Sequence, residues 1–363
     1  MGNEPVSYSV LCVAGFGRQR NDDVQYGKIE THLAPIDRAT VEFTYIGPNT
    51  FRPPSRSFDL RAVSQSNYRP ITQLKQLFAI CRLSYTSEYA LIVSYSLFPY
   101  GLIALIGKRL SGTPAHLGIL GMDLDVHEQA PYGVFVRWLF KQFDSISVAG
   151  TDYQSRLLAC GVSSERIVDM PHPVDQRYVV AEPTDNPETD ILWIGRMSAE
   201  KDPIRFVDIV DRLRDRGVYC QATMIGDGPL FSDVLDEIAA KELSDRISTP
   251  GWVADPLPQY QQSRMLVSTS AREMLPLTVV EGMHVGIPPV VPDLGGLPDL
   301  ITTNQNGIIV SDRSPDTYAD TIIDLLADEA KRQELAAAAP QIHHDFSPQA
   351  VAHQWMDILA SIN

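Results

Sequence analysis

RMLVSTSAREMLPLTVVEGMHVGIPPVVPDLGGLPDLI, residues 264–301, decides the fold class of this chain. Its apolar run MLVSTS is typical of a buried strand, and the residues from Arg272 to Pro276 form an exit loop. LTVVEGMHV then predicts a helix that ends before Gly286. A strand that passes through a short loop into a helix is the repeating unit of parallel α/β sheets.

Two carboxylates flank the predicted helix start, Glu273 in the loop and Glu281 in the first turns. Free backbone N–H groups and the positive end of the helix dipole lie between them, which favours phosphate or another anion. Carboxylates at such a place can accept hydrogen bonds from ribose or hexose hydroxyls. The alternative is an acidic first helical turn beside an exposed loop charge, because the helix dipole alone favours acids there.

The composition is that of an ordinary soluble globular protein. Its 363 residues, 44% hydrophobic and 21% charged, exceed what one core usually serves, so two domains are expected. A net charge of −15 argues against a nucleic-acid partner, whose binding surface would be basic. Four cysteines without paired spacing suggest neither a zinc site nor disulfides, and they fit a reducing cytoplasm. No Lys or Arg precedes Arg18, so no secretory signal is expected.

Apolar runs bounded by turn residues predict six strands in each half of the chain. In the first half they lie at 9–15, 40–47, 90–96, 114–121, 145–150 and 166–172. In the second half they lie at 191–195, 222–226, 246–251, 265–270, 288–292 and 307–310. Helical patterns in the first half lie at 27–36, 73–83, 102–110, 134–143 and 153–159, and a last helix is predicted at 347–362.

These patterns predict an α/β protein of two doubly wound, Rossmann-like domains that face each other across a cleft. The domains are expected at 1–174 and 175–346, because a polar, proline-bearing stretch after His172 is the best linker. The last helix, 347–363, could pack back on the first domain. The uncharged segment Tyr89–Gly107 is predicted as strand, turn and helix, since Pro99 and Gly101 interrupt it; a membrane-spanning helix is the alternative.

IGRMSAEKDP, residues 194–203, follows a predicted strand of the second half. Gly195 allows close backbone approach, and Pro203 is well placed to start a helix. Arg196 and Lys201 beside that helix start suit a diphosphate, although a surface salt bridge is the simpler interpretation.

Three further turns follow strands of the second half. IGDGP (225–229) places Gly226 at a tight turn, and DLGGLPDLI (293–301) begins a helix after a Gly-Gly turn. PGW (250–252) leaves Trp252 either in the core, which is favoured, or at the border of a base pocket. Simple turn chemistry could explain each of them.

Together and in this order, these motifs resemble the nucleotide-sugar-binding domain of GT-B glycosyltransferases of the retaining, group 1 (family 4) type. GRMSAEKD matches that family's G-R-x-x-x-x-K-(G/D) loop, IGDGP its second turn, and EMLPLTVVEGM its E-x7-E segment. GIPPVVPDLGGLPDLI continues the match. The first half agrees more loosely, through residues 90–125 and GVSSERIVDMPHPVD at 161–175.

The resemblance implies a role for each matching residue. Arg196 and Lys201 would neutralise the donor's pyrophosphate, Glu281 would bind the ribose, and Glu273 would contact the transferred sugar, which makes Glu273, Arg196 and Lys201 the catalytic candidates. The remaining donor-site candidates are Leu275, Pro276, Leu277, Thr278, Gly195, Gly226, Trp252, Val253, Gly15 and Gly17. Gly121 and Asp123 are the candidates on the acceptor side.

The first half also departs from the family pattern. Leu120 stands where the family often has His before Gly-x-Asp, which puts a hydrogen bond to the sugar or acceptor in doubt. The first loop, AGFGRQRNDD at 14–23, lacks a Gly-Gly turn. Its Arg18 and Arg20 could serve an anionic acceptor, but solvated loop charges are favoured.

By this resemblance the chain is expected to transfer a hexose from a UDP or GDP sugar to an acceptor hydroxyl, with retention of configuration. The nucleotide-diphosphate sugar is a co-substrate, and no cofactor or metal is expected. The acceptor is a sugar, a lipid-linked glycan or a small molecule, in glycan or glycolipid synthesis. The alternatives are a non-catalytic sugar-nucleotide or glycan-binding protein, and a GT-B epimerase or phosphorylase.

The expected location is the cytoplasm, and peripheral membrane contact is left open. In VFVRWLFKQF, residues 134–143, Arg137 and Lys141 alternate with apolar residues. A core stripe with solvated cations is favoured there over a membrane-binding face. The sequence predicts no particular oligomeric state.

Overall fold

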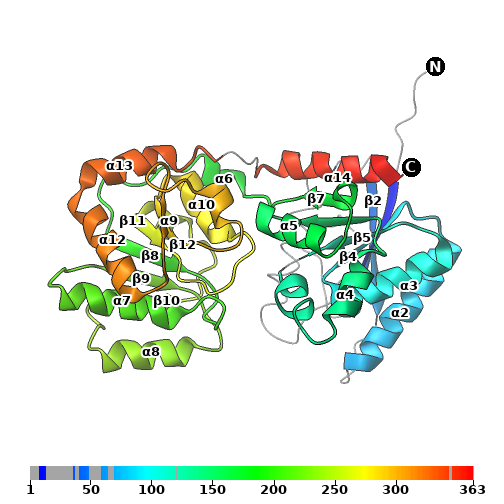
Figure 1. The fold of residues 1–363 in the computed structure, drawn as a ribbon, viewed down its shortest axis with the longest axis horizontal. Helices are drawn as coiled ribbons and strands as arrows, with labels where there is room; N and C mark the ends of the chain where they lie inside the picture. Colours follow the sequence, from blue (N-terminus) through cyan, green and yellow to red (C-terminus); the bar gives the residue numbers. More distant parts are fainter. Residues whose placement is uncertain are drawn as a thin grey trace, which may run out of the picture. The chain divides into compact units, whose positions relative to one another are not determined.

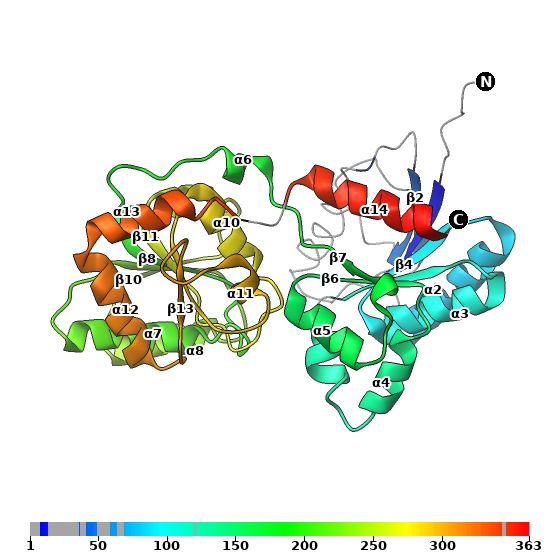
Figure 2. The same cartoon turned by 45° about the horizontal axis from the view of Figure 1, so that its top comes forward.

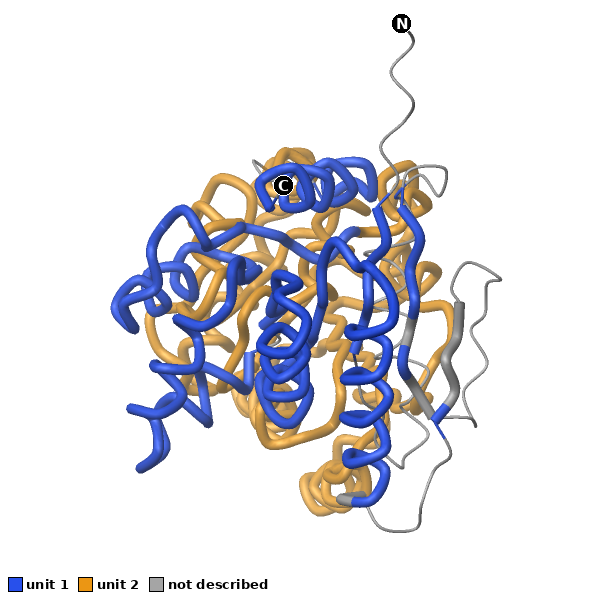
Figure 3. The backbone as a smooth tube through the Cα atoms, turned by 90° about the vertical axis from the view of Figure 1, so that its right-hand side faces the viewer, with its two compact units in different colours: residues 1–173, 346–363 blue, residues 174–345 orange. Residues whose placement is uncertain are grey.

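The computed structural model describes residues 8–13, 36, 41–48, 59–63, 69–119, 121–342 and 346–362. The chain divides into two compact units (Figure 3). Unit 1 comprises Met1–Pro173 and Phe346–Asn363, and unit 2 comprises Val174–Asp345. The domain boundaries expected from the sequence lie one residue from these.

Unit 1 is built on a seven-stranded parallel sheet with the order β3-β2-β1-β4-β5-β6-β7. Its strands are β1 (Tyr8–Val13), β2 (Val41–Pro48), β3 (Asp59–Val63), β4 (Leu91–Tyr95), β5 (Ala115–Gly118), β6 (Ser145–Val148) and β7 (Ile167–Asp169). The helices between them include α2 (Arg69–Thr86), α3 (Leu102–Ser111), α4 (Gly133–Phe140) and α5 (Thr151–Ala159). All five residues of β4 are buried, as expected for a central strand covered on both faces.

Unit 1 differs from the sequence prediction at one strand, β3. β3 was not predicted, because its sequence DLRAV contains two charges and no continuous apolar run. The segment 89–107 divides into β4, the turn Leu97–Gly101 and α3, which confirms the predicted strand, turn and helix. Apart from Ile36, the helix predicted at 27–36 lies outside the described residues. Within the described ranges, no helix combines the length and apolar character needed to cross a bilayer.

The last helix, α14 (Pro348–Ile362), packs on the sheet of unit 1. Its buried Val351, Trp355 and Leu359 share a core with Val10 of β1 and Leu91 of β4. The Trp355 ring also meets the buried imidazole of His116 edge-on, at 4.9 Å between centroids. Figure 1 shows α14 over one face of the sheet and α2, α3 and α4 on the other side.

Unit 2 has a six-stranded parallel sheet with the order β10-β9-β8-β11-β12-β13. Its strands are β8 (Thr189–Ile194), β9 (Ala222–Ile225), β10 (Ile247–Gly251), β11 (Ser263–Val267), β12 (Pro289–Pro292) and β13 (Ile308–Val310), close to the six predicted. Its helices are α6 (Gln176–Val179), α7 (Pro203–Asp215), α8 (Phe231–Ala240), α9 (Leu257–Gln261), α10 (Leu277–Val285), α11 (Leu297–Leu300), α12 (Pro315–Ala327) and α13 (Glu329–Ala338). The strand order reverses between β8 and β11, where doubly wound sheets bind their ligands.

The predicted linker differs from the observed one at its start. Val174 and Tyr178 are buried, and α6 forms within the stretch that was expected to be irregular. The Tyr178 ring meets the Tyr260 ring edge-on, at 5.8 Å, so the chain is anchored as soon as it enters unit 2.

Replacing Trp355 with Ala should destabilise unit 1, because it removes a fully buried side chain that joins α14 to the sheet. We expect a loss of about 3–5 kcal/mol in the free energy of unfolding of that unit. Amide hydrogen exchange should accelerate in β1 and β4 but not in β8 and β11. His353→Ala, at an exposed position of the same helix, is the control, and equal effects in both units would contradict the assignment of α14.

Candidate functional site

The parallel strands of unit 2 bring the predicted motif loops to one edge of the sheet. The loop after β9 packs directly on the loop after β8. Gly226 has φ of +142°, and a Cβ there would overlap the carbonyl oxygen of Gly195. The N–H of Gly195 donates to the Ile225 carbonyl (3.0 Å), and that of Gly226 to the Gly251 carbonyl (2.9 Å). Gly195 and Gly226 therefore allow the backbones of the loops after β8 and β9 to come into contact.

Lys201 and Glu273, predicted from separate motifs, form an ion pair. The Ser270 hydroxyl also donates to Glu273 Oε1, at 2.8 Å. The Glu273 side chain is only 10% exposed and that of Lys201 27%, so the pair is largely shielded from water. The structure thus joins the loop after β8 to the loop after β11 through opposite charges.

Thr269, a buried residue that no sequence motif singled out, holds the loop that carries Lys201. The indole N–H of Trp193 donates to its hydroxyl oxygen (3.0 Å). The same hydroxyl lies 3.0 Å from the Lys201 carbonyl and 2.9 Å from the Asp202 carbonyl. Arg313 adds a second tie, since its Nη2 donates to Asp202 Oδ2 (2.6 Å) and to the Thr269 carbonyl (2.9 Å). Lys201 is therefore presented by a fixed backbone.

The Gly-Gly turn after β12 supports the Glu273 loop from its other side. A Cβ at Gly295 would overlap the Glu273 carbonyl oxygen, and the Gly296 N–H donates to the Met274 carbonyl (2.6 Å). The structure thus shows that the Gly-Gly turn packs its backbone against the loop that carries Glu273.

Glu281 lies on α10 and receives a hydrogen bond from a tyrosine that was not predicted from the sequence. The buried Tyr260 hydroxyl lies 3.0 Å from Glu281 Oε2 and 2.9 Å from the Thr278 carbonyl. Burial, and then the charge of Glu281, raise the pKa of the Tyr260 hydroxyl, which keeps it protonated and able to donate. The same two causes raise the pKa of Tyr178 to about 12. The pattern QYQQ around Tyr260 gave no signal of this role.

The start of α10 supplies backbone donors between the two glutamates. Pro276 is the N-cap residue and makes no side-chain cap, and Leu277 and Thr278 are the first helical residues. Their N–H groups have no carbonyl four residues earlier within the helix, so they remain available to an anion or a sugar hydroxyl. Leu275 precedes them in the half-buried exit loop.

Arg196 and Trp252 are both exposed in this unit. Trp252 is 66% exposed, so the favoured prediction of a core tryptophan is wrong. Its strand ends at Gly251 and the chain turns outward there, leaving Val253 half-buried. An exposed indole is compatible with the second interpretation, the border of a base pocket.

Asp123, which was predicted on the acceptor side, is 1% exposed and stabilises a turn of unit 1. Its Oδ1 accepts from the Leu97 N–H (2.8 Å) and the Ser96 hydroxyl (3.3 Å), and burial raises its pKa. Gly121 before it has φ of +101°. The role of both residues toward an acceptor stays a prediction. Leu120 and the loop at 14–23, with Gly15, Gly17, Arg18 and Arg20, lie outside the described residues.

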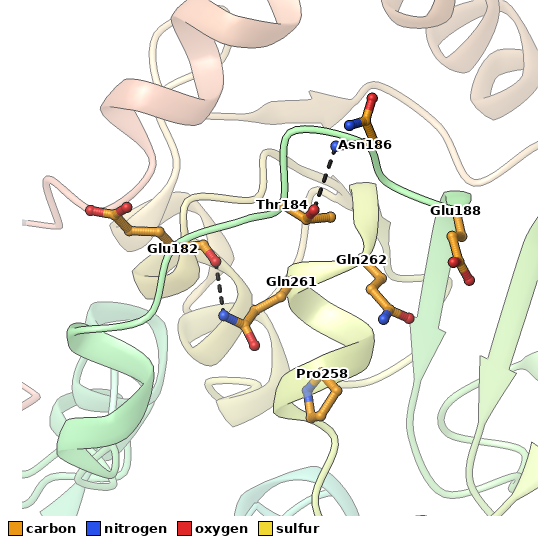
Figure 4. A pocket seen from close by; sticks show the side chains of 7 residues that line it. All are labelled: Glu182, Thr184, Asn186, Glu188, Pro258, Gln261 and Gln262. Atoms are coloured by element: carbon orange, nitrogen blue, oxygen red, sulfur yellow. Dashed lines mark hydrogen bonds between the residues drawn. The ribbon is translucent and has the colours of Figure 1, made fainter.

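A cavity of about 270 Å³ in unit 2 contains none of the predicted site residues. It is lined by Glu182, Thr184, Asn186, Glu188, Pro258, Gln261 and Gln262 (Figure 4). The Gln261 amide donates to the Glu182 carbonyl (2.9 Å), which ties the linker to α9. Throughout the described ranges, the structure places no group of three or more His, Cys, Asp or Glu side chains that could hold a metal ion.

Known proteins resemble this chain in the sequence of unit 2 and in the fold of the whole chain. Residues 175–342 match the family model of glycosyl transferases group 1. The chain is 30% identical over 175 residues to the alpha-D-kanosaminyltransferase of Streptomyces kanamyceticus, covering 47% of this chain and 45% of that protein. It is 26% identical over 178 residues to the GalNAc-alpha-(1->4)-GalNAc-alpha-(1->3)-diNAcBac-PP-undecaprenol alpha-1,4-N-acetyl-D-galactosaminyltransferase of Campylobacter jejuni, covering 48% and 49%. Each match thus spans about half the length of the relative.

The crystal structure of Anabaena Alr3699/HepE in complex with UDP superposes with a TM-score of 0.79 at 17% identity, covering 97% of this chain and 99% of that one. The class is therefore a GT-B fold of two Rossmann-like units. Within unit 2, residues 175–342 are similar to the group 1 glycosyltransferases.

Replacing Gly226 with Ala should displace the loops after β8 and β9, because a methyl group there overlaps the Gly195 carbonyl. Gly217→Ala is the matched control, since Gly217 also has a positive φ, +75°, but a methyl group there would have no atom within 4 Å. We expect Gly226→Ala to lower the free energy of unfolding by about 1–3 kcal/mol more than the control. Urea unfolding and hydrogen exchange would measure this, and equal costs would contradict the close approach.

Proposed function

We propose that the chain is a retaining, metal-independent glycosyltransferase of the cytoplasm that acts in glycan or glycolipid synthesis. It moves a hexose from a UDP or GDP sugar to an acceptor hydroxyl. The observation that carries the proposal is the Lys201–Glu273 pair at the β8–β11 switch point, beside the open N-terminus of α10. The transferase names of the relatives and the UDP complex of the structural neighbour support it.

Donor binding begins with an exchange of partners at Lys201. In the structure its ammonium is neutralised by Glu273. An incoming pyrophosphate brings its own negative charges, so it can take over Lys201 and leave the Glu273 carboxylate to accept from hydroxyls of the sugar. Arg196 is exposed at the other end of the same loop and binds a second phosphate oxygen as a planar fork.

The ribose is held by Glu281, whose position is fixed by the Tyr260 hydroxyl. The free N–H groups at the start of α10 bind the phosphate or the sugar between the two glutamates. Each polar group of the donor thus meets a partner whose backbone is already anchored, which lowers the ordering cost of binding.

Transfer requires stabilisation of the charge that grows on the leaving diphosphate. Lys201, Arg196 and the α10 dipole supply it from fixed positions. For a same-face attack, the departing phosphate oxygen accepts the proton of the acceptor hydroxyl as the new glycosidic bond forms. Glu273 holds the hexose so that its anomeric carbon faces the acceptor.

A thermal-shift screen of UDP, GDP and their sugars tests the proposal directly. A specific ligand present at a hundred times its Kd stabilises the folded chain by about 2.7 kcal/mol. A nucleotide sugar that raises the Tm is then tested for transfer to glycan acceptors. Binding without transfer or hydrolysis favours the non-catalytic alternative, and altered free sugar without an acceptor favours an epimerase.

Lys201→Met and Glu273→Gln should separate binding from transfer. Lys201→Met removes a phosphate-binding charge, so the affinity for the nucleoside diphosphate should fall at least about tenfold. Glu273→Gln removes the carboxylate that competes for Lys201, so that affinity should be unchanged or higher. Its kcat should nevertheless fall about 10²–10³-fold, through lost contact with the sugar. Calorimetry and initial rates measure the two effects.

Lys331→Met, which breaks an exposed ion pair with Glu334, is the control and should change neither quantity. If Glu273→Gln keeps near wild-type turnover, Glu273 only stabilises the loop. If Lys201→Met binds the diphosphate normally, the exchange of partners is wrong.

Transfer should persist in excess EDTA, because the proposed site neutralises the diphosphate with two cations and a helix N-terminus. Initial rates before and after chelation, with Mg²⁺ or Mn²⁺ added back, measure this. Strict dependence on the added ion would refute a metal-independent reaction.

A further inference from the structure

Half of the large exposed apolar side chains lie on three consecutive helices of unit 1. Of the 18 such side chains among the described residues, nine belong to α2, α3 and α4. They are Ile71, Leu74, Phe78, Tyr85, Ile106, Leu110, Val134, Phe135 and Trp138. We call the outward face of these helices the α2–α4 surface.

α2 carries two apolar stripes. Ile80 is fully buried and faces α3, where a Cβ at Gly107 would lie 2.9 Å from its Cγ2 atom. Ile71, Leu74 and Phe78 follow each other at intervals of three and four residues, so they share one side of the helix. These three side chains are 43%, 63% and 71% exposed. The second stripe therefore has no role in the core of unit 1.

α4, like α2, has apolar side chains both on its buried side and on its exposed side. Val136 and Phe140 are buried, whereas Trp138 is 53% exposed and Phe135 48%. The predicted core stripe is therefore wrong for Trp138. Its ring stacks on Phe135 at 5.7 Å, which forms an aromatic pair on the outside of the helix.

The three helices form one layer. α3 and α4 connect the neighbouring strands β4, β5 and β6 in the same direction, so right-handed crossovers place them on the same face. Lys108 near the end of α3 donates to the Gln142 carbonyl just after α4 (2.7 Å). Figure 1 and Figure 2 both show α2, α3 and α4 on the side of the sheet opposite α14.

The charge of these helices is opposite to that of the protein. They contain six Lys and Arg residues and no Asp or Glu, in a chain whose net charge is −15. Lys75, Arg82 and Arg109 are exposed, as is Lys141 directly after α4. Arg137 is paired with Glu128 from the preceding turn, at 2.7 Å. Lys108 is likewise paired with Asp144, at 2.7 Å. The exposed cations that remain give the α2–α4 surface a local positive charge, which favours an anionic partner.

We propose that the α2–α4 surface docks on an anionic lipid bilayer. Exposed Trp, Phe and Tyr rings with aliphatic neighbours are the side chains that favour the interface between headgroups and acyl chains. Long Lys and Arg side chains beside them can bury their stems and reach lipid phosphates. A nucleic acid would satisfy the cations but would leave the aliphatic stripe of α2 in water. The inference does not depend on transferase activity.

Co-sedimentation of the full chain with vesicles tests the proposal. Binding is expected to vesicles of phosphatidylcholine with phosphatidylglycerol, to weaken as salt rises, and to be at least tenfold weaker for phosphatidylcholine alone. The double variant Phe78→Ser/Trp138→Ser removes the apolar contacts, and Lys75→Glu/Arg82→Glu reverses two charges. Each should lower the partition constant at least about tenfold, since one cation contributes about fivefold.

The control variants lie on unit 2. Tyr219→Ser removes an aromatic side chain that is 60% exposed, and Arg212→Glu reverses a surface charge; neither should change vesicle binding. The proposal is overturned if the wild-type chain binds neither vesicle, or if the α2–α4 variants bind as well as the controls. It is also overturned if light scattering shows a dimer that the same variants dissociate, because a second copy would then cover the surface.

Discussion

The ion pair between Lys201 and Glu273 is the interaction around which the candidate site of unit 2 is arranged. A shielded ion pair contributes little net stability, because desolvation of both charges offsets most of their attraction. Its consequence here is positional, since it joins the loops that leave the two strands at the point where the sheet order reverses. Thr269 anchors the cationic side of the pair, and Gly295 supports the acidic side through backbone contact. In the proposed reaction, an anionic ligand therefore meets a cation that is already held in place.

Glu273 and Glu281 have partners of different charge, so they are expected to respond differently to an anionic ligand. Glu273 is balanced by a full positive charge and by the Ser270 hydroxyl, so a competing anion can release it. Glu281 receives a hydrogen bond from the buried Tyr260, whose neutral hydroxyl carries no positive charge to attract a competing anion. In the proposed reaction Glu281 thus keeps its hydrogen bond with Tyr260 when the donor binds, whereas Glu273 can exchange Lys201 for the sugar. This difference agrees with a holding role for Glu281 and an acting role for Glu273 in the proposed reaction.

The predictable parts of the fold were those that local chemistry determines. Strands buried on both faces, such as β4, appear as uninterrupted apolar runs, and Gly286 marks the end of α10 in the left-handed conformation. β3 lacked such a run and was missed. Thr269 and Tyr260 were also missed, because their roles arise from partners 67 to 76 and 18 to 21 residues away in the sequence. Trp252 shows the same limit, since no local pattern states whether a large ring after a strand turns inward or outward.

Both units contain local groups of cations in a chain that is acidic overall. A chain with a net charge of −15 repels anions on average, so anion binding requires local groups of cations. Unit 2 concentrates Arg196 and Lys201 on one loop, at the positive end of a helix. Unit 1 instead has six cations on α2, α3 and α4, which contain no acids and which also expose apolar side chains. A compact pair of cations suits a small diphosphate, whereas an extended layer of apolar and basic side chains suits the surface of a lipid bilayer. The two proposed kinds of recognition therefore both rest on local positive charge, and the apolar content of the surface distinguishes them.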